Sequence, residues 1–155
     1  MPTYSRSTFI AASPRKVFSL HFGSDALARL VPPWESVTVA SAPEMPHDGT
    51  EARLRVGFGP FKLSWVARHE GFRDRGEEGG EFTDVQISGP FRAWRHRHVV
   101  RPEKNGAVLE DTITYELPFG PLGRLFAGRM TEKKIEKMFE YRHRVTKESA
   151  ERTHE

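Results

Sequence analysis

Hydrophobic and polar residues alternate along most of the chain before residue 118, a spacing typical of half-buried β-strands. The segment Thr50–Phe58 shows the pattern most clearly, because Ala52, Leu54 and Val56 share one face and arginines occupy the other. Gly-Pro and Asn-Gly pairs between the segments indicate tight turns, so we expect a largely antiparallel sheet with one covered face. The predicted strands are Thr3–Ala11, Glu35–Ala42, Thr50–Phe58, Phe61–Glu70, Glu81–Ile87, Phe91–Arg101 and Ala107–Leu117.

Two short helices are predicted directly after the first strand. Ser13 is a suitable N-cap and Pro14 a suitable first helical residue, which indicates a helix from Pro14 to about His21. A second helix should begin at Ser24-Asp25 and continue through Leu30, because the prolines that follow cannot extend it. A strand, two helices, six strands and a final helix form an α+β arrangement.

The chain turns helical from Pro121 to about residue 149. Its apolar residues form two groups that a helical wheel places on opposite sides, the first comprising Leu122, Leu125, Phe126 and Met130, the second Ile135, Met138, Phe139 and Val145. One straight helix cannot bury both groups against one sheet, so we expect a kink or break between Gly128 and Lys133. Residues Ala150–Glu155 should fray.

The amino-acid composition excludes several classes of site and function. The chain has no cysteine, which excludes disulfides and cysteine-based metal sites, and no apolar run near the roughly 20 residues of a membrane span. The net charge is only +3, and the arginines within Arg92–His98 alternate with other residues as on a solvated strand face, so nucleic-acid binding is not predicted. The first residues lack a signal-peptide core, and the expected location is therefore the cytoplasm.

Several segments together resemble one family. They are Pro14 with Val17-Phe18, Pro32-Pro33-Trp34, the run Gly89–His98, Asp111 with Tyr115–Gly123, and Phe139–His143. In order and spacing they resemble the START-like (SRPBCC) superfamily, in its bacterial polyketide cyclase/dehydrase-like and coenzyme Q-binding-like branch. The resemblance implies a helix-grip fold, a curved antiparallel sheet of about six to seven strands around a long C-terminal helix. It implies one ligand-binding domain over residues 1–149 with a tail at 150–155, and an apolar cavity used elsewhere for lipids, quinones and polyketides.

His96 and His98 are two residues apart on a predicted strand, so both imidazoles project to the same face. Two such imidazoles can share a metal ion if a third ligand is near, and Asp111, His69 and His21 are the candidates. The alternative is that both rings are hydrogen-bonded groups that hold the strand and helix together. No companion metal motif is present, and we therefore predict no metal site.

Asp111 lies on the apolar side of its predicted strand, where a carboxylate must be paired or hydrogen-bonded. The neighbouring strand offers His96 or His98, and the last helix offers Arg142. We therefore predict a buried polar cluster of these residues. It can act by fixing the register of strand and helix, or as the polar anchor of an apolar pocket.

The predicted function is the binding or transport of a small hydrophobic molecule, such as a lipid, quinone or polyketide, in a cavity between sheet and helix. The alternative is a cofactor-independent aromatase/cyclase or dehydratase using His/Asp acid–base chemistry, with His96, His98, Asp111 and Tyr115 as catalytic candidates. We expect no cofactor and no stable membrane insertion. The predicted ligand site, with Phe61 as its gate, comprises Trp34, Leu54, Val56, Phe61, Trp65, Trp94, His96, His98, Asp111, Tyr115, Phe126, Met130 and Arg142.

Overall fold

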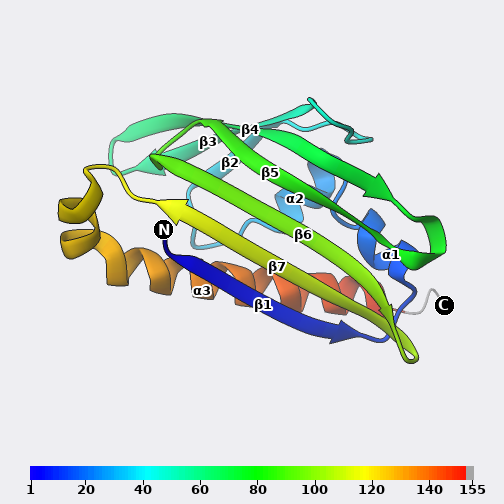
Figure 1. The fold of residues 1–155 in the computed structure, drawn as a ribbon. Helices are drawn as coiled ribbons and strands as arrows, with labels where there is room; N and C mark the ends of the chain where they lie inside the picture. The colour runs from blue at the N-terminus through cyan, green and yellow to red at the C-terminus, as the bar shows by residue number, and fades with distance from the viewer. Residues whose placement is uncertain (153–155) are drawn as a thin grey trace.

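A computed structural model describes residues 1–152 and shows one seven-stranded antiparallel sheet that curves over a long helix (Figure 1). The strand order is β1-β7-β6-β5-β4-β3-β2, so only the β1–β7 pairing joins strands distant in sequence. The predicted helix-grip α+β fold is confirmed. The strands are β1 (Thr3–Ile10), β2 (Val37–Ser41), β3 (Glu51–Phe58), β4 (Phe61–Asp74), β5 (Gly80–Ser88), β6 (Ala93–Glu103) and β7 (Gly106–Glu116).

Both predicted short helices are present as α1 (Pro14–Ser19) and α2 (Ser24–Arg29). The N-cap of α1 is the expected one, because the Ser13 hydroxyl accepts a hydrogen bond from the Lys16 amide at 3.2 Å. A turn of 3-10 helix at Gly76–Glu78 joins β4 to β5. Helix α1 lies at one end of the sheet, beside the connection between β4 and β5, whereas α2 contacts β2 (Figure 1).

The last helix, α3 (Gly120–Glu151), differs from the prediction. It is helical throughout, so of the kink or break expected between Gly128 and Lys133 the break is wrong. The assumption that both apolar groups are buried is wrong as well, because Ile135 and Phe139 are buried whereas the first group is exposed. The exposed fractions are 62% for Leu122, 75% for Leu125, 82% for Phe126 and 64% for Met130.

The helix also continues beyond the predicted point of fraying. Ala150 is buried in the core, and Glu151 accepts a hydrogen bond from the Ala11 amide at 2.9 Å, so these contacts hold the last turn against the end of β1. The rest of the predicted tail, residues 153–155, lies outside the described residues.

The core consists of two apolar clusters separated by a group of buried and partly buried polar residues. We call this group the polar belt; it comprises His69, Asp84, His96, His98, Asp111 and His143. One cluster gathers around α1 and includes Val17, Phe18 and Leu109; the other lies under the middle of α3 and includes Trp94, Ile113, Tyr115 and Phe139. Alternation along β6 and β7 puts His96, His98 and Asp111 on the same face, between the two clusters. The core-facing side of the sheet therefore carries ionisable side chains between two apolar regions.

Two phenylalanines of α3 test this division of the helix. Phe139 is fully buried, so Phe139→Ala should lower the free energy of unfolding by about 3–5 kcal/mol. Phe126→Ala, at a largely exposed position, should change it by less than about 0.5 kcal/mol. Urea denaturation followed by circular dichroism measures both, and similar losses for the two variants would contradict the burial described here.

Candidate functional site

The register of four adjacent strands assembles the polar belt. Asp84 of β5 pairs with His69 of β4 on one side and with His96 of β6 on the other, and His98 pairs with Asp111 of β7. Directly opposed residues of neighbouring strands point to the same face. Three imidazoles and two carboxylates therefore meet on the concave side of the sheet without any contribution from a loop.

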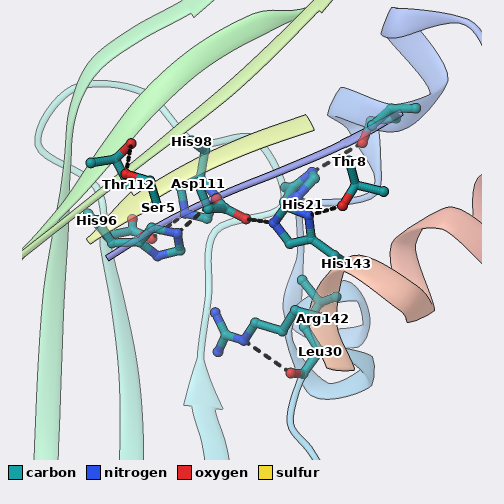
Figure 2. Close-up of polar contacts among 12 residues, drawn as sticks. Ser5, Thr8, His21, Leu30, His96, His98, Asp111, Thr112, Arg142 and His143 are labelled. Carbon is teal, nitrogen blue, oxygen red and sulfur yellow. Dashed lines mark hydrogen bonds and ion pairs between the residues drawn. The ribbon is translucent and has the colours of Figure 1, made fainter. Parts of the chain in front are cut away.

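Asp111 is the centre of this group (Figure 2). Its Oδ1 lies 2.9 Å from His96 Nε2 and 2.9 Å from His98 Nδ1, and its Oδ2 lies 2.7 Å from Nε2 of His143 on α3. The His98 contact has ion-pair distance without hydrogen-bond angles. The other nitrogen of His143 lies 2.7 Å from Thr8 Oγ1 on β1. One carboxylate thus links strands β1, β6 and β7 to the long helix.

Asp84 is the second anionic centre. Its Oδ2 lies 3.0 Å from His98 Nε2, and its Oδ1 lies 3.2 Å from His69 Nε2. The remaining ring nitrogen of His69 lies 3.0 Å from the Thr50 hydroxyl. The His98 ring is therefore held between two carboxylates, and it stacks on Phe82 with ring centres 4.3 Å apart.

Burial and the two carboxylates set the protonation states. Burial favours a low pKa for His98, but Asp111 and Asp84 outweigh it and raise the pKa to about 9. Burial and the positive charge of His98 lower the pKa of His96, and likewise of His21, to about 4. Although burial alone would raise the pKa of Asp111, the neighbouring imidazoles lower it well below its usual value. At neutral pH, His98 is a cation between two anions, whereas His96 and His21 are neutral.

Arg142 occupies a different place from the one predicted. The contact from α3 to Asp111 comes from His143, while Arg142 donates its Nε hydrogen to the Leu30 carbonyl at 3.2 Å. Burial lowers the pKa of Arg142, partly offset by the charges of Asp111 and Asp84. Within residues 1–152 no carboxylate forms an ion pair with this guanidinium. Figure 2 shows it below the imidazole cluster, with the Nη atoms drawn free of contacts to the other residues shown.

At the place of the predicted cavity, the described residues leave a small cavity between sheet and helix. Its volume is about 10 Å³, space for one water molecule, and its walls include His96, His98, Asp111 and Arg142. The other predicted site residues are divided between burial and exposure. Val56, Trp94 and Tyr115 are buried, Leu54 and Trp65 partly buried, and Trp34, Phe61, Phe126 and Met130 exposed.

Trp34 lies apart from the belt. Its ring meets Tyr141 of α3 edge-on, with centres 5.4 Å apart, at an open surface groove of about 290 Å³. Neither Trp34 nor the predicted gate residue Phe61 therefore borders the cavity at the belt.

Sequence reasoning missed Asp84 and His143, although signals for both exist. Asp84 shares a strand face with the apolar Phe82, the same argument that singled out Asp111. His143 follows Phe139 by four residues and so lies on the buried side of the helix. Partner identities needed the strand register, which alternation alone does not supply.

Donor atoms of Asp84, His96 and His98 lie within 4.8 Å of one another, which is close enough to hold a metal ion. Asp84 was not among the predicted third ligands. A metal at this point would have to displace a ring proton of the His98 cation, whose Nε2 faces Asp84 and whose Nδ1 faces Asp111, because ligating nitrogens must be free of hydrogen. The donor set therefore already has a charge-balanced arrangement without a metal.

The chain matches the family model described as "Polyketide cyclase / dehydrase and lipid transport" over residues 10–140. The chain belongs to this family. A search of curated proteins returned no match. None of the helices within residues 1–152 has the length and apolar character needed to cross a membrane.

Solved structures share the fold of this family member. The protein TTHA0849 from Thermus thermophilus is 22% identical with a TM-score of 0.67, and the alignment covers 95% of each chain. A nucleoside-diphosphate sugar epimerase from Corynebacterium glutamicum is 28% identical with a TM-score of 0.71, covering 94% of this chain but only 28% of the epimerase. The di-domain ARO/CYC StfQ of the steffimycin biosynthetic pathway is 11% identical with a TM-score of 0.69, covering 96% of this chain and 50% of StfQ.

Replacing the central carboxylate tests the belt. Asp111→Asn keeps the size of the side chain but removes the charge that faces His98, so the free energy of unfolding should fall by about 3–5 kcal/mol. Glu110→Gln, the neighbouring residue on the opposite strand face, should change it by less than about 0.5 kcal/mol. Chemical denaturation measures both, and an Asp111→Asn variant as stable as the parent would contradict a paired, buried anion.

Stability should pass through a maximum near pH 6.5. Because the folded pKa of His98 is about 9 against 6.5 for a free imidazole, its contribution is complete below pH 6.5 and is lost as the pH rises to 9. His96 and His21, with folded pKa values of about 4, favour the unfolded state as the pH falls from 6.5 to 4. The midpoint of urea denaturation, measured from pH 4 to pH 9, follows the loss of stability on both sides of pH 6.5. A midpoint that does not fall between pH 6.5 and 9 would show that His98 is not held as a cation.

Proposed function

We propose that this family member binds a small hydrophobic molecule that carries an acceptor oxygen, such as a carboxylate, a ketone or a quinone carbonyl. The observation that carries the proposal is Arg142, a partly buried cation that lines the belt cavity without a carboxylate partner among the described residues. A guanidinium has five donor hydrogens in a planar fork, and a bound oxygen would use those not engaged by Leu30.

A second unused donor supports the same ligand chemistry. The indole Nε1 of Trp65 is buried and has no hydrogen-bond partner within the described residues. Buried donors are normally paired, so an unpaired one is consistent with an acceptor supplied by a ligand. Trp65 meets Trp94 edge-on at 5.2 Å, and Phe91 lies 4.8 Å from Trp94, so aromatic rings surround this donor.

The apolar part of the ligand has surface available on the same face of the sheet. Leu54 pairs with Trp65 and Val56 with Leu63, so these side chains continue the aromatic face toward the β3–β4 turn. Leu63 is 43% exposed, and Leu54 and Trp65 are partly exposed. A ligand that covers them gains the free energy of removing apolar surface from water.

Binding at the belt requires movement, because a cavity of about 10 Å³ admits no organic molecule. Leu30 is the wall residue best placed to move. It lines the cavity, and its carbonyl accepts the hydrogen bond from Arg142. A ligand oxygen that replaces this carbonyl at the guanidinium would release the end of α2 from α3 and widen the site.

The comparisons favour the same class of ligand. The family description joins cyclases and dehydrases with lipid transport, and StfQ is named an ARO/CYC of a biosynthetic pathway. We extend to this chain only the handling of a hydrophobic small molecule. The belt then serves as its polar anchor.

Acid–base catalysis is the second candidate, and one observation favours it. His96 is neutral, lines the cavity and donates its Nε2 hydrogen to Asp111, which orients the ring and leaves Nδ1 as the basic atom. A pKa of about 4 makes it a weak base at neutral pH, however, and His98 is held by carboxylates on both sides. The geometry therefore supports anchoring better than proton transfer.

Arg142→Met tests the anchor. Anilinonaphthalene sulfonate, a flat apolar probe with an anionic group, should lose about tenfold or more in affinity, because a charge-assisted hydrogen bond contributes roughly 1.5–3 kcal/mol. Arg144→Met, an exposed arginine two residues further along α3, is the matched control and should leave the dissociation constant within about twofold. Fluorescence titration measures both. Equal affinity of the two variants would exclude Arg142 as the anchor.

Native mass spectrometry of protein purified from its own host distinguishes binding from turnover. A co-purifying apolar molecule at one-to-one stoichiometry, absent from the Arg142→Met variant, supports a carrier. If the parent protein instead converts the bound compound to a product and the His96→Gln variant does not, the catalytic alternative replaces the carrier proposal.

A further inference from the structure

The first turns of α3 present large apolar side chains to solvent. We name the tip patch as the five residues Phe119, Leu122, Leu125, Phe126 and Met130. Each of them is at least 62% exposed, and Phe119 reaches 86%. Contiguous exposed apolar surface of this kind is uncommon on soluble monomers and marks an interaction site.

The helix is turned so that these residues face away from the protein. The partly buried positions of this stretch are occupied by small residues, namely Gly123, Ala127, Gly128 and Thr131. Gly123 approaches the Pro118 carbonyl so closely that an added Cβ would overlap it, so a larger residue does not fit at this position. The sequence thus has small side chains inside and large apolar ones outside, the reverse of a helix that covers a sheet.

The charges around the tip patch are positive. Residues 119–134 contain four basic residues and one acidic residue, a net charge of +3 that equals the net charge of the whole chain, so the remaining residues balance. Lys134 lies 3.7 Å from Glu35. Within residues 1–152, Arg124, Arg129 and Lys133 form no ion pair. At about 100° per residue, Arg129 and Lys133 continue the arc of the apolar side chains toward the middle of the helix.

A second segment at the same end of the molecule has the same character. The β3–β4 turn and the first turns of α3 lie at one end of the fold, opposite the β6–β7 turn (Figure 1). Phe61 beside that turn is 71% exposed, and the next residue is Lys62. Apolar side chains flanked by basic ones on two separate segments favour a broad, anionic and apolar partner.

We infer that the tip patch docks this protein reversibly onto the surface of a bilayer containing anionic lipids, with the apolar side chains at the acyl boundary and the basic ones among the headgroups. A basic helix with one apolar face adsorbs to such surfaces because its apolar side chains are buried at the acyl boundary and its basic side chains are attracted to the anionic headgroups. The inference goes beyond the proposed ligand site and does not depend on Arg142. It adds the place where a hydrophobic molecule would be collected or delivered.

Co-sedimentation with phosphatidylcholine vesicles containing phosphatidylserine tests the docking. The parent protein should sediment with these vesicles, and less with phosphatidylcholine alone or at high salt, because salt screens the headgroup attraction. The double variant Phe126→Ser/Met130→Ser should lose about tenfold or more in vesicle affinity. The matched control Met45→Ser/Ile87→Ser changes two other exposed apolar residues and should stay within about twofold.

Arg129→Glu tests the electrostatic part and should lower affinity for the anionic vesicles about tenfold. Lys104→Glu makes the same charge change at the opposite end, in the β6–β7 turn, and should change affinity less than about twofold. Arg142→Met should bind vesicles like the parent, which separates this inference from the ligand anchor.

Three results would overturn the inference. They are a parent protein that stays in the supernatant with anionic vesicles, tip and control variants that bind equally, and a dimer in sedimentation velocity that Phe126→Ser/Met130→Ser converts to a monomer. The last result would assign the tip patch to a second copy of the chain.

Discussion

The structure depends on the pairing of the Asp111 carboxylate, because one buried anion joins three imidazoles from two elements distant in sequence. His96 and His98 come from the neighbouring strand, whereas His143 comes from the helix that crosses beneath. An isolated charge at this depth would be strongly unfavourable, so the fold is satisfied only when sheet and helix are in register. The polar belt, which lies between the two apolar clusters, therefore stabilises one register of the helix on the sheet.

The charge balance of the belt explains why Arg142 is available to the proposed ligand. Asp84 and Asp111 supply two negative charges, and His98, held between them, supplies one positive charge. Arg142 supplies the second positive charge, at a distance that balances the site without a direct ion pair within the described residues. Its donors are therefore not consumed by the polar belt, and the proposed ligand oxygen can use them. The imidazoles are engaged in holding the fold, which leaves them less suited to proton transfer.

The sequence predicted the strands, because alternation is a local property of a half-buried sheet. It also predicted a paired Asp111, since a carboxylate on an apolar face has few alternatives. It did not predict the contacts of Asp84 or His143, which arise from cross-strand register and from the rotation of α3. The predicted site also included Phe126 and Met130, because hydrophobicity was equated with burial. The structure shows that these residues face away from the core.

The two halves of α3 differ for a physical reason. From Ile135 onward, large apolar residues and His143 face the sheet, where their burial and pairing hold the helix in place. Before Ile135, small residues face inward, so this half has few large side chains to bury and its large ones remain in water. A helix anchored firmly at one end can keep its other end ordered despite an exposed apolar face, since the folding free energy comes from the anchored half. That arrangement keeps the tip patch available for a surface outside the protein.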